Sequence, residues 1–347
     1  MRWDGQGVGV DDGALPGLAR IGLVRSVRTP QFEGITFHEV LCKSALNKVP
    51  NAAMLPFRYT VNGYRGCSHA CRYCFARPTH EYLDLDCGAD FDTQVVVKIN
   101  VADVLRRELR RPSWTRETVA LGTNTDPYQR AEGRYALMPG IIGALADSGT
   151  PFSILTKGTL LRRDLPLIAE ASRRVEVSVA ISLAVGDPAL HRDVEPGTPS
   201  PQARLALITA VREAGLDCHV MVAPILPYLT DSADHLDALL GRIAAAGATG
   251  VTAFGLHLRG STRGWFLDWL ARSHPELVER YRQLYRRGAY LPPEYRTMLH
   301  ERVTPLIAKH GLGPDRRTFR SSAPAPELPG PVAPVAHAPA VLQPTLF

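Results

Sequence analysis

A regular pattern of hydrophobic and polar positions begins at Phe57 and continues to Leu258. Short runs rich in β-branched residues alternate with longer stretches in which apolar positions recur three and four residues apart, as in strands and amphipathic helices. The short runs predict strands at residues 58–61, 95–99, 118–121, 152–156, 175–183, 218–225 and 251–256. The longer stretches predict helices that include 101–110, 160–173, 201–214 and 233–246.

This alternation predicts an α/β fold. Strands that alternate with helices of this length form βαβ units and a parallel sheet. About six such units fit between Tyr59 and Leu258, enough for a partial (β/α)6 barrel. In such folds the reactive side chains gather at the carboxyl ends of the strands.

The segments before and after this region lack the regular pattern. The first forty residues are Gly-rich and irregular, so we expect an N-terminal extension over 1–56 and a barrel core over 57–260. Helices expected at 275–287 and 295–309 form a C-terminal extension over 261–320. Residues 321–347 alternate Pro with Ala and Val and carry few charges, which predicts a disordered tail.

Composition places the chain among ordinary globular proteins. Of 347 residues 45% are hydrophobic, and no apolar run is long enough to span a bilayer. The first fifteen residues include Asp4, Asp11 and Asp12 and no apolar block, unlike a secretory signal. Six cysteines in such a chain indicate thiols or metal ligands rather than disulfides. We therefore expect a cytoplasmic protein that does not enter membranes.

The net charge of +6 says little about partners. Only five of the 40 basic residues are lysines, and an arginine bias of this kind also arises from a GC-rich genome. A modest positive charge favours non-specific attraction to polyanions. A nucleic-acid partner therefore needs support from a local feature.

The strongest chemical signal is a cysteine triplet. Cys67, Cys71 and Cys74 follow the first predicted barrel strand with the spacing C-x3-C-x2-C. Three thiolates can hold an iron–sulfur cube and leave one iron open for chemistry. Tyr73, beside the last cysteine, can place its aromatic face on a bound purine.

Two other sites would use the same cysteines. A structural zinc site needs a fourth ligand, for which His69 and His80 are available. An electron-transfer cluster needs a fourth cysteine, and Cys87 is the near one. Either site would be closed to substrate.

The triplet, with an aromatic residue before its last cysteine, resembles the motif of the radical S-adenosylmethionine (radical SAM) superfamily. The stretch from Phe57 to Glu81 is similar to a bacterial branch distantly related to spore photoproduct lyase, and the resemblance extends over about 35–310. It implies a [4Fe–4S] cluster on Cys67, Cys71 and Cys74. S-adenosylmethionine would chelate the open iron and, after one-electron reduction by a donor such as flavodoxin or ferredoxin, give a 5′-deoxyadenosyl radical.

The loop after the strand at 118–121 carries hydrogen-bonding groups on Thr123, Asn124 and Asp126. In the superfamily this loop binds the ammonium group of the cofactor, so the resemblance makes these residues cofactor contacts. The alternative for Asp126 is an Asx turn before Pro127.

Three further positions are candidate contacts at strand ends and the helix that follows. Lys157 could pair with a carboxylate or phosphate, or be solvated. The resemblance places Ser182 near the ribose. Arg204 and Glu195 could bind the cofactor's carboxylate end or form a salt bridge with each other.

The remaining cysteines limit the resemblance. Spore photoproduct lyase relays a hydrogen atom through a cysteine well downstream of the triplet. Cys87 is too near the triplet and Cys218 begins a strand, so the lyase reaction itself does not follow. Cys42 and Cys218 are expected to be buried as small apolar residues.

Two features bear on DNA. The stretch Arg280–Arg287 interleaves arginines with Tyr281 and Tyr285, but its apolar spacing favours packing over base stacking. Residues 343–347, Gln-Pro-Thr-Leu-Phe, resemble the peptide with which bacterial repair proteins bind the DNA sliding clamp. The chain is thus predicted to be a radical SAM enzyme of unknown substrate, with DNA repair or modification as one role. The alternatives are an electron-transfer or redox-sensing protein, and a DNA-associated module with a structural cluster.

Overall fold

The computed structural model describes residues 7–8, 22–50 and 55–313. The tail at 321–347 and its terminal peptide lie outside these residues. Among the described helices, none is both long and apolar enough to cross a membrane.

The larger sheet has seven strands in the order β12-β11-β10-β9-β8-β5-β4. The six neighbouring strands from β5 to β12 run parallel, and β4 pairs antiparallel with β5. Because β4 and β12 are its two edges in the described chain, the sheet is a partial and not a closed barrel. The strands are β4 (Leu46–Lys48), β5 (Tyr59–Val61), β8 (Val119–Leu121), β9 (Phe152–Thr156), β10 (Val177–Ser182), β11 (Cys218–Ile225) and β12 (Gly250–Gly255).

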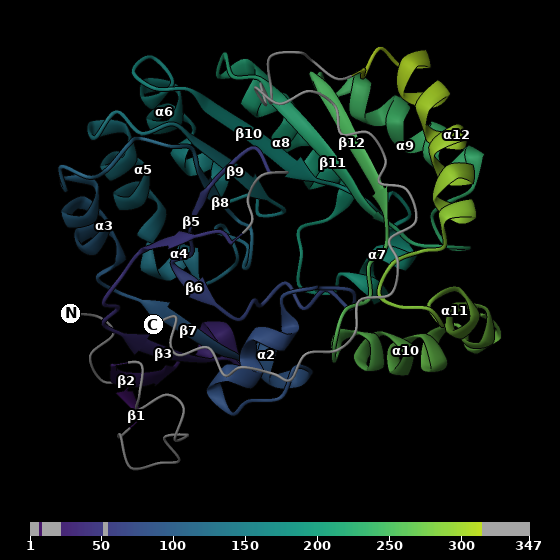
Figure 1. Cartoon of the computed structure of the whole chain (residues 1–347), viewed down its shortest axis with the longest axis horizontal. Helices are drawn as coiled ribbons and strands as arrows, with labels where there is room; N and C mark the ends of the chain where they lie inside the picture. Colours follow the sequence, from purple (N-terminus) through teal and green to yellow (C-terminus); the bar gives the residue numbers. More distant parts are fainter. Residues whose placement is uncertain (1–6, 9–21, 51–54, 314–347) are drawn as a thin grey trace, which may run out of the picture.

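Helices alternate with strands along the chain, and most of them line one side of the sheet (Figure 1). The apolar faces of most of these helices pack on the sheet in one large core because apolar side chains recur on one side of each helix; the exception is the short helix Pro188–Val194, whose Val194 belongs to the cluster around Cys71 and Tyr73. They are α3 (Val101–Leu109), α4 (Glu132–Tyr135), α5 (Leu137–Asp147), α6 (Leu161–Ala171), α7 (Pro188–Val194), α8 (Pro201–Glu213) and α9 (Ala233–Ala245).

A second sheet has five strands in the order β1-β2-β3-β7-β6. Its β3 pairs antiparallel with β2 and parallel with β7, and all five residues of β3 are buried. The segment between the cysteine loop and β7 packs beside it. The elements are β1 (Gly7–Val8), β2 (Leu23–Arg28), η2 (Pro30–Phe32), β3 (Thr36–Val40), β6 (Tyr64–Arg65), η4 (Arg77–Leu83), α2 (Ala89–Thr93) and β7 (Gln94–Lys98).

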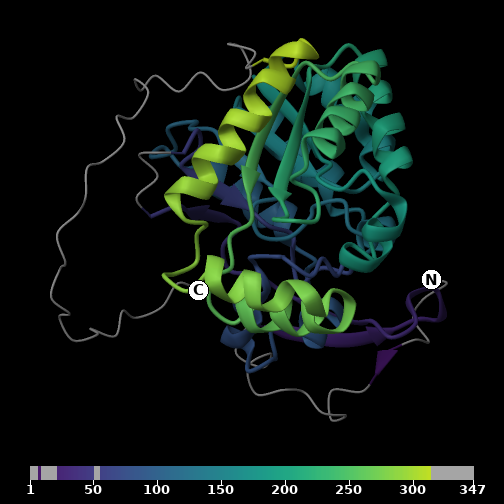
Figure 2. The same ribbon diagram turned by 90° about the vertical axis from the view of Figure 1, so that its right-hand side faces the viewer.

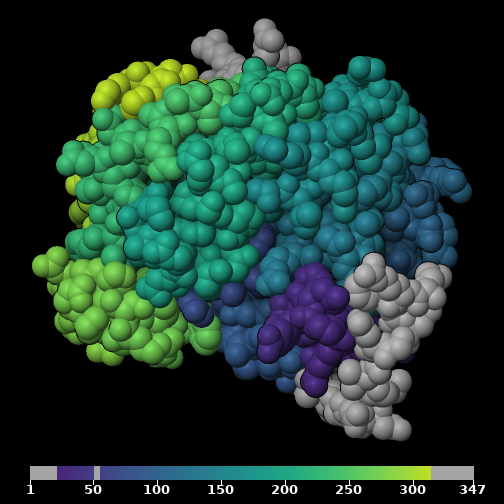
Figure 3. Space-filling model, turned by 180° about the vertical axis from the view of Figure 1, so that it is seen from behind, coloured from purple at the N-terminus to yellow at the C-terminus, as the bar shows by residue number. Residues whose placement is uncertain are grey.

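The C-terminal helices pack against the larger sheet at two places. Helices α10 (Thr262–Ser273) and α11 (Val278–Leu284), joined by η5 (Pro275–Leu277), pack below the carboxyl ends of the strands (Figure 2). Helix α12 (Pro293–Lys309) then packs against β12 and α9. Seen from behind, the N-terminal strands and α10–α11 lie below the teal segments of the barrel (Figure 3).

Three expectations from the pattern are wrong. The first forty residues are not wholly irregular, since β2 and β3 form there through strand pairing that no local period reveals. The strand at 95–99 exists as β7 but belongs to the second sheet. The helix at 275–287 is shorter, because η5 precedes it and α11 ends at Leu284.

Candidate active site

The cysteine triplet lies on a loop after β5 and β6, at the carboxyl edge of the parallel sheet. Backbone hydrogen bonds hold the loop in shape. Cys67 N donates to Phe91 O at 2.9 Å, and Cys74 N donates to Cys71 O at 3.3 Å. Gly66, before the first cysteine, has φ +83°, and a Cβ there would lie 2.9 Å from Gln94 O. The loop therefore begins at a position that requires glycine.

Two residues distant in sequence fix the first half of the loop. The amide oxygen of Gln129 accepts from Ser68 N at 3.0 Å, and its amide nitrogen donates to Gly66 O at 2.9 Å. Gly197 N donates to His69 O at 3.0 Å. A Cβ on Gly197 would lie 2.0 Å from Ser68 O, so this close approach also needs glycine.

Arg77 fixes the second half of the loop. Its guanidinium is fully buried and donates to Cys71 O at 3.0 and 3.1 Å and to Gly88 O at 2.8 Å. It also pairs with Asp92 at 2.8 Å and lies 4.7 Å from the ring centroid of Trp265. The sequence analysis gave Arg77 no role, although it stands three positions after the last cysteine.

One cavity of about 380 Å³ opens over this loop and the neighbouring strand ends. Cys67, Cys71 and Cys74 line it together. So do six of the seven predicted cofactor contacts, namely Tyr73, Thr123, Asn124, Asp126, Lys157 and Ser182. The structure therefore brings cysteines and polar strand ends to one space.

Arg204 is the predicted contact that does not line this cavity. It is fully buried and pairs with Glu195 at 2.5 Å, which confirms the salt-bridge alternative. Tyr73 donates its hydroxyl to the same carboxylate. Burial alone would raise the pKa of Glu195, but Arg204 and then Lys157 lower it to about 2. Glu195 thus remains ionised and anchors Tyr73 beside the cysteines.

Lys157 connects this ion pair to the cavity. Its Nζ lies 2.5 Å from Ser182 Oγ, 3.9 Å from Glu195 Oε1 and 5.7 Å from the ring centroid of Tyr73. The alternative of a solvated lysine is wrong, because the side chain is only 13% exposed. Lys157 therefore brings positive charge to the cavity wall.

Asp126 uses its carboxylate to shape its own loop. Its oxygens accept from Tyr128 N at 2.9 Å, which is the Asx turn, and from Thr156 Oγ1 at 2.5 Å. Lys157 N donates to it at 2.6 Å, and His69 Nδ1 lies 3.4 Å away. Burial would raise the pKa of Asp126, but His69 lowers it below its usual value.

Of the three alternative ligands, His69 lines the cavity beside Cys67, whereas His80 and Cys87 do not line it. Burial lowers the pKa of His69, but Asp126 and Cys67 raise it to about 10, so its imidazole is cationic in the absence of metal. His80 Nε2 donates to Gln94 O at 2.8 Å. Cys87 does not line the cavity and offers its carbonyl oxygen to Arg77 at 3.1 Å. His80 and Cys87 therefore lie away from the thiols that line the cavity, and His69 is paired with Asp126.

The arrangement of the three thiols bears on which metal group they could hold. Within the described ranges, no three His, Cys, Asp or Glu side chains converge as ligands of one ion do. An iron–sulfur cube does not require this convergence, because each thiolate binds a different iron. Burial raises the pKa of the Cys74 thiol to about 11, and binding of iron would replace its proton.

The part of the cavity wall formed at the end of β12, the β12 wall, was not predicted from the sequence. Phe254, His257 and Arg259 line the cavity from the end of β12. Their signal in the sequence was their place at the end of the last predicted strand (Phe254) and just after it (His257 and Arg259), at the same edge as the other strand ends.

Comparisons with known proteins agree with this geometry. The model of the Radical SAM superfamily matches residues 61–240. An uncharacterised protein of Mycobacterium tuberculosis is 83% identical over 322 residues, which cover 91% of this chain and 95% of that protein. An uncharacterised protein of Methanocaldococcus jannaschii is 29% identical over 195 residues, which cover 56% of this chain and 69% of that one.

Among solved structures, a spore photoproduct lyase complexed with dinucleoside spore photoproduct has a TM-score of 0.59 at 15% identity. The match covers 79% of each chain, and at this identity it shows a shared fold. The family model covers more than half of the chain and includes the cysteine loop and most of the cavity wall. The chain belongs to the radical SAM superfamily and is an enzyme of radical chemistry.

Proposed function

We propose that Cys67, Cys71 and Cys74 hold a [4Fe–4S] cluster and that S-adenosylmethionine binds in the adjoining cavity. The observation that carries this proposal is the shared lining of one cavity by the three cysteines and the polar strand ends. When bound, the reduced cluster and S-adenosylmethionine supply a hydrogen-abstracting radical. The chain itself must orient the cofactor and limit access of water.

In this proposal, some residues contact the cofactor and others hold the contacting residues in position. Thr123 and Asn124 present polar groups for the ammonium end of the cofactor, and Ser182 presents a hydroxyl for the ribose. Lys157 supplies a cation on the same wall. Asp126 and Arg204 act through others, since Asp126 fixes its loop and Arg204 fixes Glu195.

Anaerobic reconstitution followed by reduction in the presence of S-adenosylmethionine tests the proposal. We expect 5′-deoxyadenosine and methionine as products. Cys71→Ala should abolish the visible absorbance of the cluster and the cleavage of the cofactor, because only two of the three ligands remain. Cys87→Ala is the matched control and should change neither. An intact cluster without cofactor cleavage would instead favour electron transfer or redox sensing.

DNA is the substrate that we favour, and the enzyme would act in repair or modification. A spore photoproduct lyase of similar fold carries a dinucleoside photoproduct. The reductant would be a cytoplasmic flavodoxin or ferredoxin. Loss of damaged or undamaged DNA coupled to cofactor cleavage would test this substrate directly.

The C-terminal peptide suggests a tether. Residues 343–347 lie outside the described part of the chain, and their sequence resembles a sliding-clamp peptide. We expect deletion of these residues to abolish retention of the protein on immobilised clamp, because such peptides bind through few side chains. Cofactor cleavage should be unchanged. Retention of the truncated chain would contradict the tether.

A further inference from the structure

A second pocket adjoins the cavity that holds the cysteines. It has a volume of about 300 Å³ and lies between β12, the loop before α12 and α12 itself. Phe254 and His257 line both spaces, so the pocket and the cavity share a wall. We call it the β12–α12 pocket; its floor is apolar and includes Ile225, Leu291, Leu299 and Val303.

The shared wall is aromatic. Phe254 is 42% exposed, and its ring stacks on that of His257 with centroids 5.7 Å apart and planes 24° from parallel. Tyr290 is 48% exposed and meets His257 edge to face at 4.6 Å. Large aromatic side chains exposed together beside a cavity form a surface on which a flat ring can stack.

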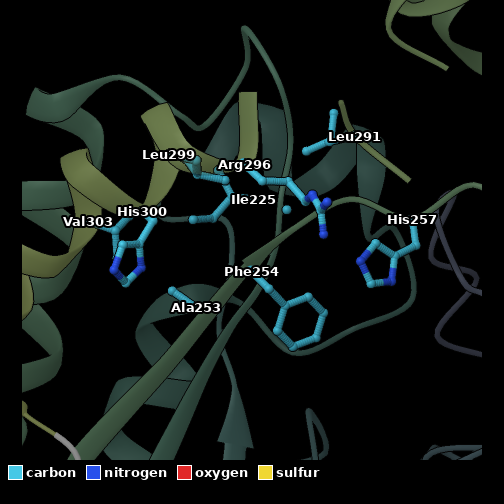
Figure 4. A pocket seen from close by; sticks show the side chains of 10 residues that line it. Ile225, Ala253, Phe254, His257, Leu291, Arg296, Leu299, His300 and Val303 are labelled. Atoms are coloured by element: carbon cyan, nitrogen blue, oxygen red, sulfur yellow. The ribbon is translucent and has the colours of Figure 1, made fainter. Parts of the chain in front are cut away.

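Arginines surround these rings. Arg259 lies 5.0 Å from the ring centroid of Tyr290 and also lines the cysteine cavity. Arg296, on the first turn of α12, points its guanidinium into the space between His257 and Phe254 (Figure 4). Burial lowers the pKa of His257, and the nearby Arg259 and Arg296 lower it further.

The charge of the pocket has one sign. Its lining in the described chain comprises Arg296, two histidines and otherwise glycine and apolar residues, with no carboxylate among them. Arg296 is exposed, and neither a hydrogen bond nor an ion pair of its guanidinium is present within the described ranges. A guanidinium without a carboxylate partner is well suited to bind a phosphate.

We propose that the β12–α12 pocket is a substrate subsite for a planar ring that carries a phosphate, that is, for a nucleotide unit. The ring stacks on Phe254, and the phosphate binds Arg296 with support from Arg259. Because Phe254 and His257 also face the cysteine cavity, a nucleotide held here extends toward the place where the radical would form. This inference rests on the proposed function and names the class of its substrate.

Binding measurements on the full-length protein, without reductant, test the subsite apart from any radical chemistry. The probes are a fluorescent oligothymidylate of about eight nucleotides, followed by anisotropy, and thymidine 5′-monophosphate, followed by calorimetry. Arg296→Gln should weaken binding about tenfold and flatten its salt dependence, because one phosphate contact is lost. Phe254→Leu should weaken it about fivefold or more, through loss of stacking.

Two variants keep the test specific. Arg107→Gln removes an exposed arginine from α3, on the side of the molecule away from α12, and should stay within about twofold of the wild type. Phe254→Tyr keeps the ring and should bind as the wild type does. Thermal unfolding checks that every variant is folded.

The outcomes separate two sources of the nucleotide. If the monophosphate binds with the same dependence on Arg296 and Phe254, the subsite accepts a free nucleotide. If only the oligonucleotide does, it accepts a unit of a strand. The proposal is overturned if neither probe binds the wild type, if both variants bind normally, or if Leu and Tyr at position 254 weaken binding equally.

The proposed radical chemistry is tested independently by cofactor cleavage without substrate. Wild-type protein that forms 5′-deoxyadenosine but shows no binding dependent on Arg296 would reject the subsite alone. Binding that depends on Arg296 and Phe254, in a protein that never cleaves the cofactor, would reject the proposed function alone.

Discussion

The two walls of the central cavity are built in opposite ways. On the cysteine wall, Cys71 is 7% exposed and its carbonyl oxygen is held by the fully buried Arg77. On the β12 wall, Phe254 is 42% exposed, and Tyr290, which contacts His257 of this wall, is 48% exposed. Buried hydrogen bonds to backbone atoms fix the cysteine wall, as a site for a group of fixed shape requires. The open wall leaves room for a ligand from outside.

The electrostatics of the two walls differ in the same way. On the cysteine wall, positive and negative groups are paired, as in Arg77 with Asp92 and Arg204 with Glu195. On the β12 wall, Arg259 contributes positive charge to an aromatic surface, and Arg296 adds to it from the adjoining β12–α12 pocket. Paired buried charges position a loop, whereas exposed cations beside rings can bind an anion. The contrast assigns positioning to one wall and recognition to the other.

The largest expected effect comes from removing the central group of the cysteine wall. Arg77→Met leaves the largely buried Asp92 without its partner and leaves the carbonyl oxygens of Cys71 and Gly88 without this donor. We expect the free energy of unfolding to fall by about 3 kcal/mol, as when one partner of a buried ion pair is removed. Chemical denaturation measures it, and iron content after reconstitution should fall as well.

Two further variants help to interpret this result: Arg77→Lys is the conservative substitution, and Arg272→Met is the surface control. Lysine keeps the charge but cannot donate to all of these oxygens at once, so an intermediate loss is expected. Arg272 is exposed on α10, and its replacement should change stability by less than about 0.5 kcal/mol. Equal stability of Arg77→Met and Arg272→Met would show that Arg77 does not hold the loop.

A smaller effect depends on pH. Burial lowers the pKa of His80 to about 4, and its Nδ1 has no hydrogen-bond partner in the described structure. The folded state therefore keeps His80 neutral, whereas the unfolded chain protonates near pH 6.5. The resulting stabilisation is complete above pH 6.5 and is lost as the pH falls toward 4.

Denaturation of the wild type and of His80→Gln at pH 7 and pH 5 measures this contribution. We expect the wild type to lose about 2 kcal/mol more than the variant over this interval. If the free energy of unfolding fell equally in the two proteins, His80 would be protonated in the folded state at pH 5. The cysteine wall would then contain an unpaired buried charge, contrary to the pattern described above.

The cysteine wall could largely be predicted from sequence, and the β12 wall could not. Cys67, Cys71 and Cys74 are close in sequence, and the strand period places Thr123, Lys157 and Ser182 at strand ends. Arg77 and Gln129 were not predicted because most of their hydrogen-bond partners are backbone atoms, which carry no residue signature. Phe254 and Arg296 are brought together by the packing of α12 on β12, which is tertiary and has no local pattern.

The smallest effect distinguishes buried from exposed aromatic residues outside the cavity. The Tyr281 hydroxyl, fully buried on α11, donates to Pro227 O at 2.7 Å, which agrees with packing of this helix rather than base stacking. Tyr281→Phe should lower the free energy of unfolding by about 1 kcal/mol and leave affinity for oligothymidylate unchanged. Tyr82→Phe, at a residue 83% exposed, should change neither. If Tyr281→Phe weakened oligonucleotide binding without loss of stability, α11 would belong with the β12 wall as a recognition surface.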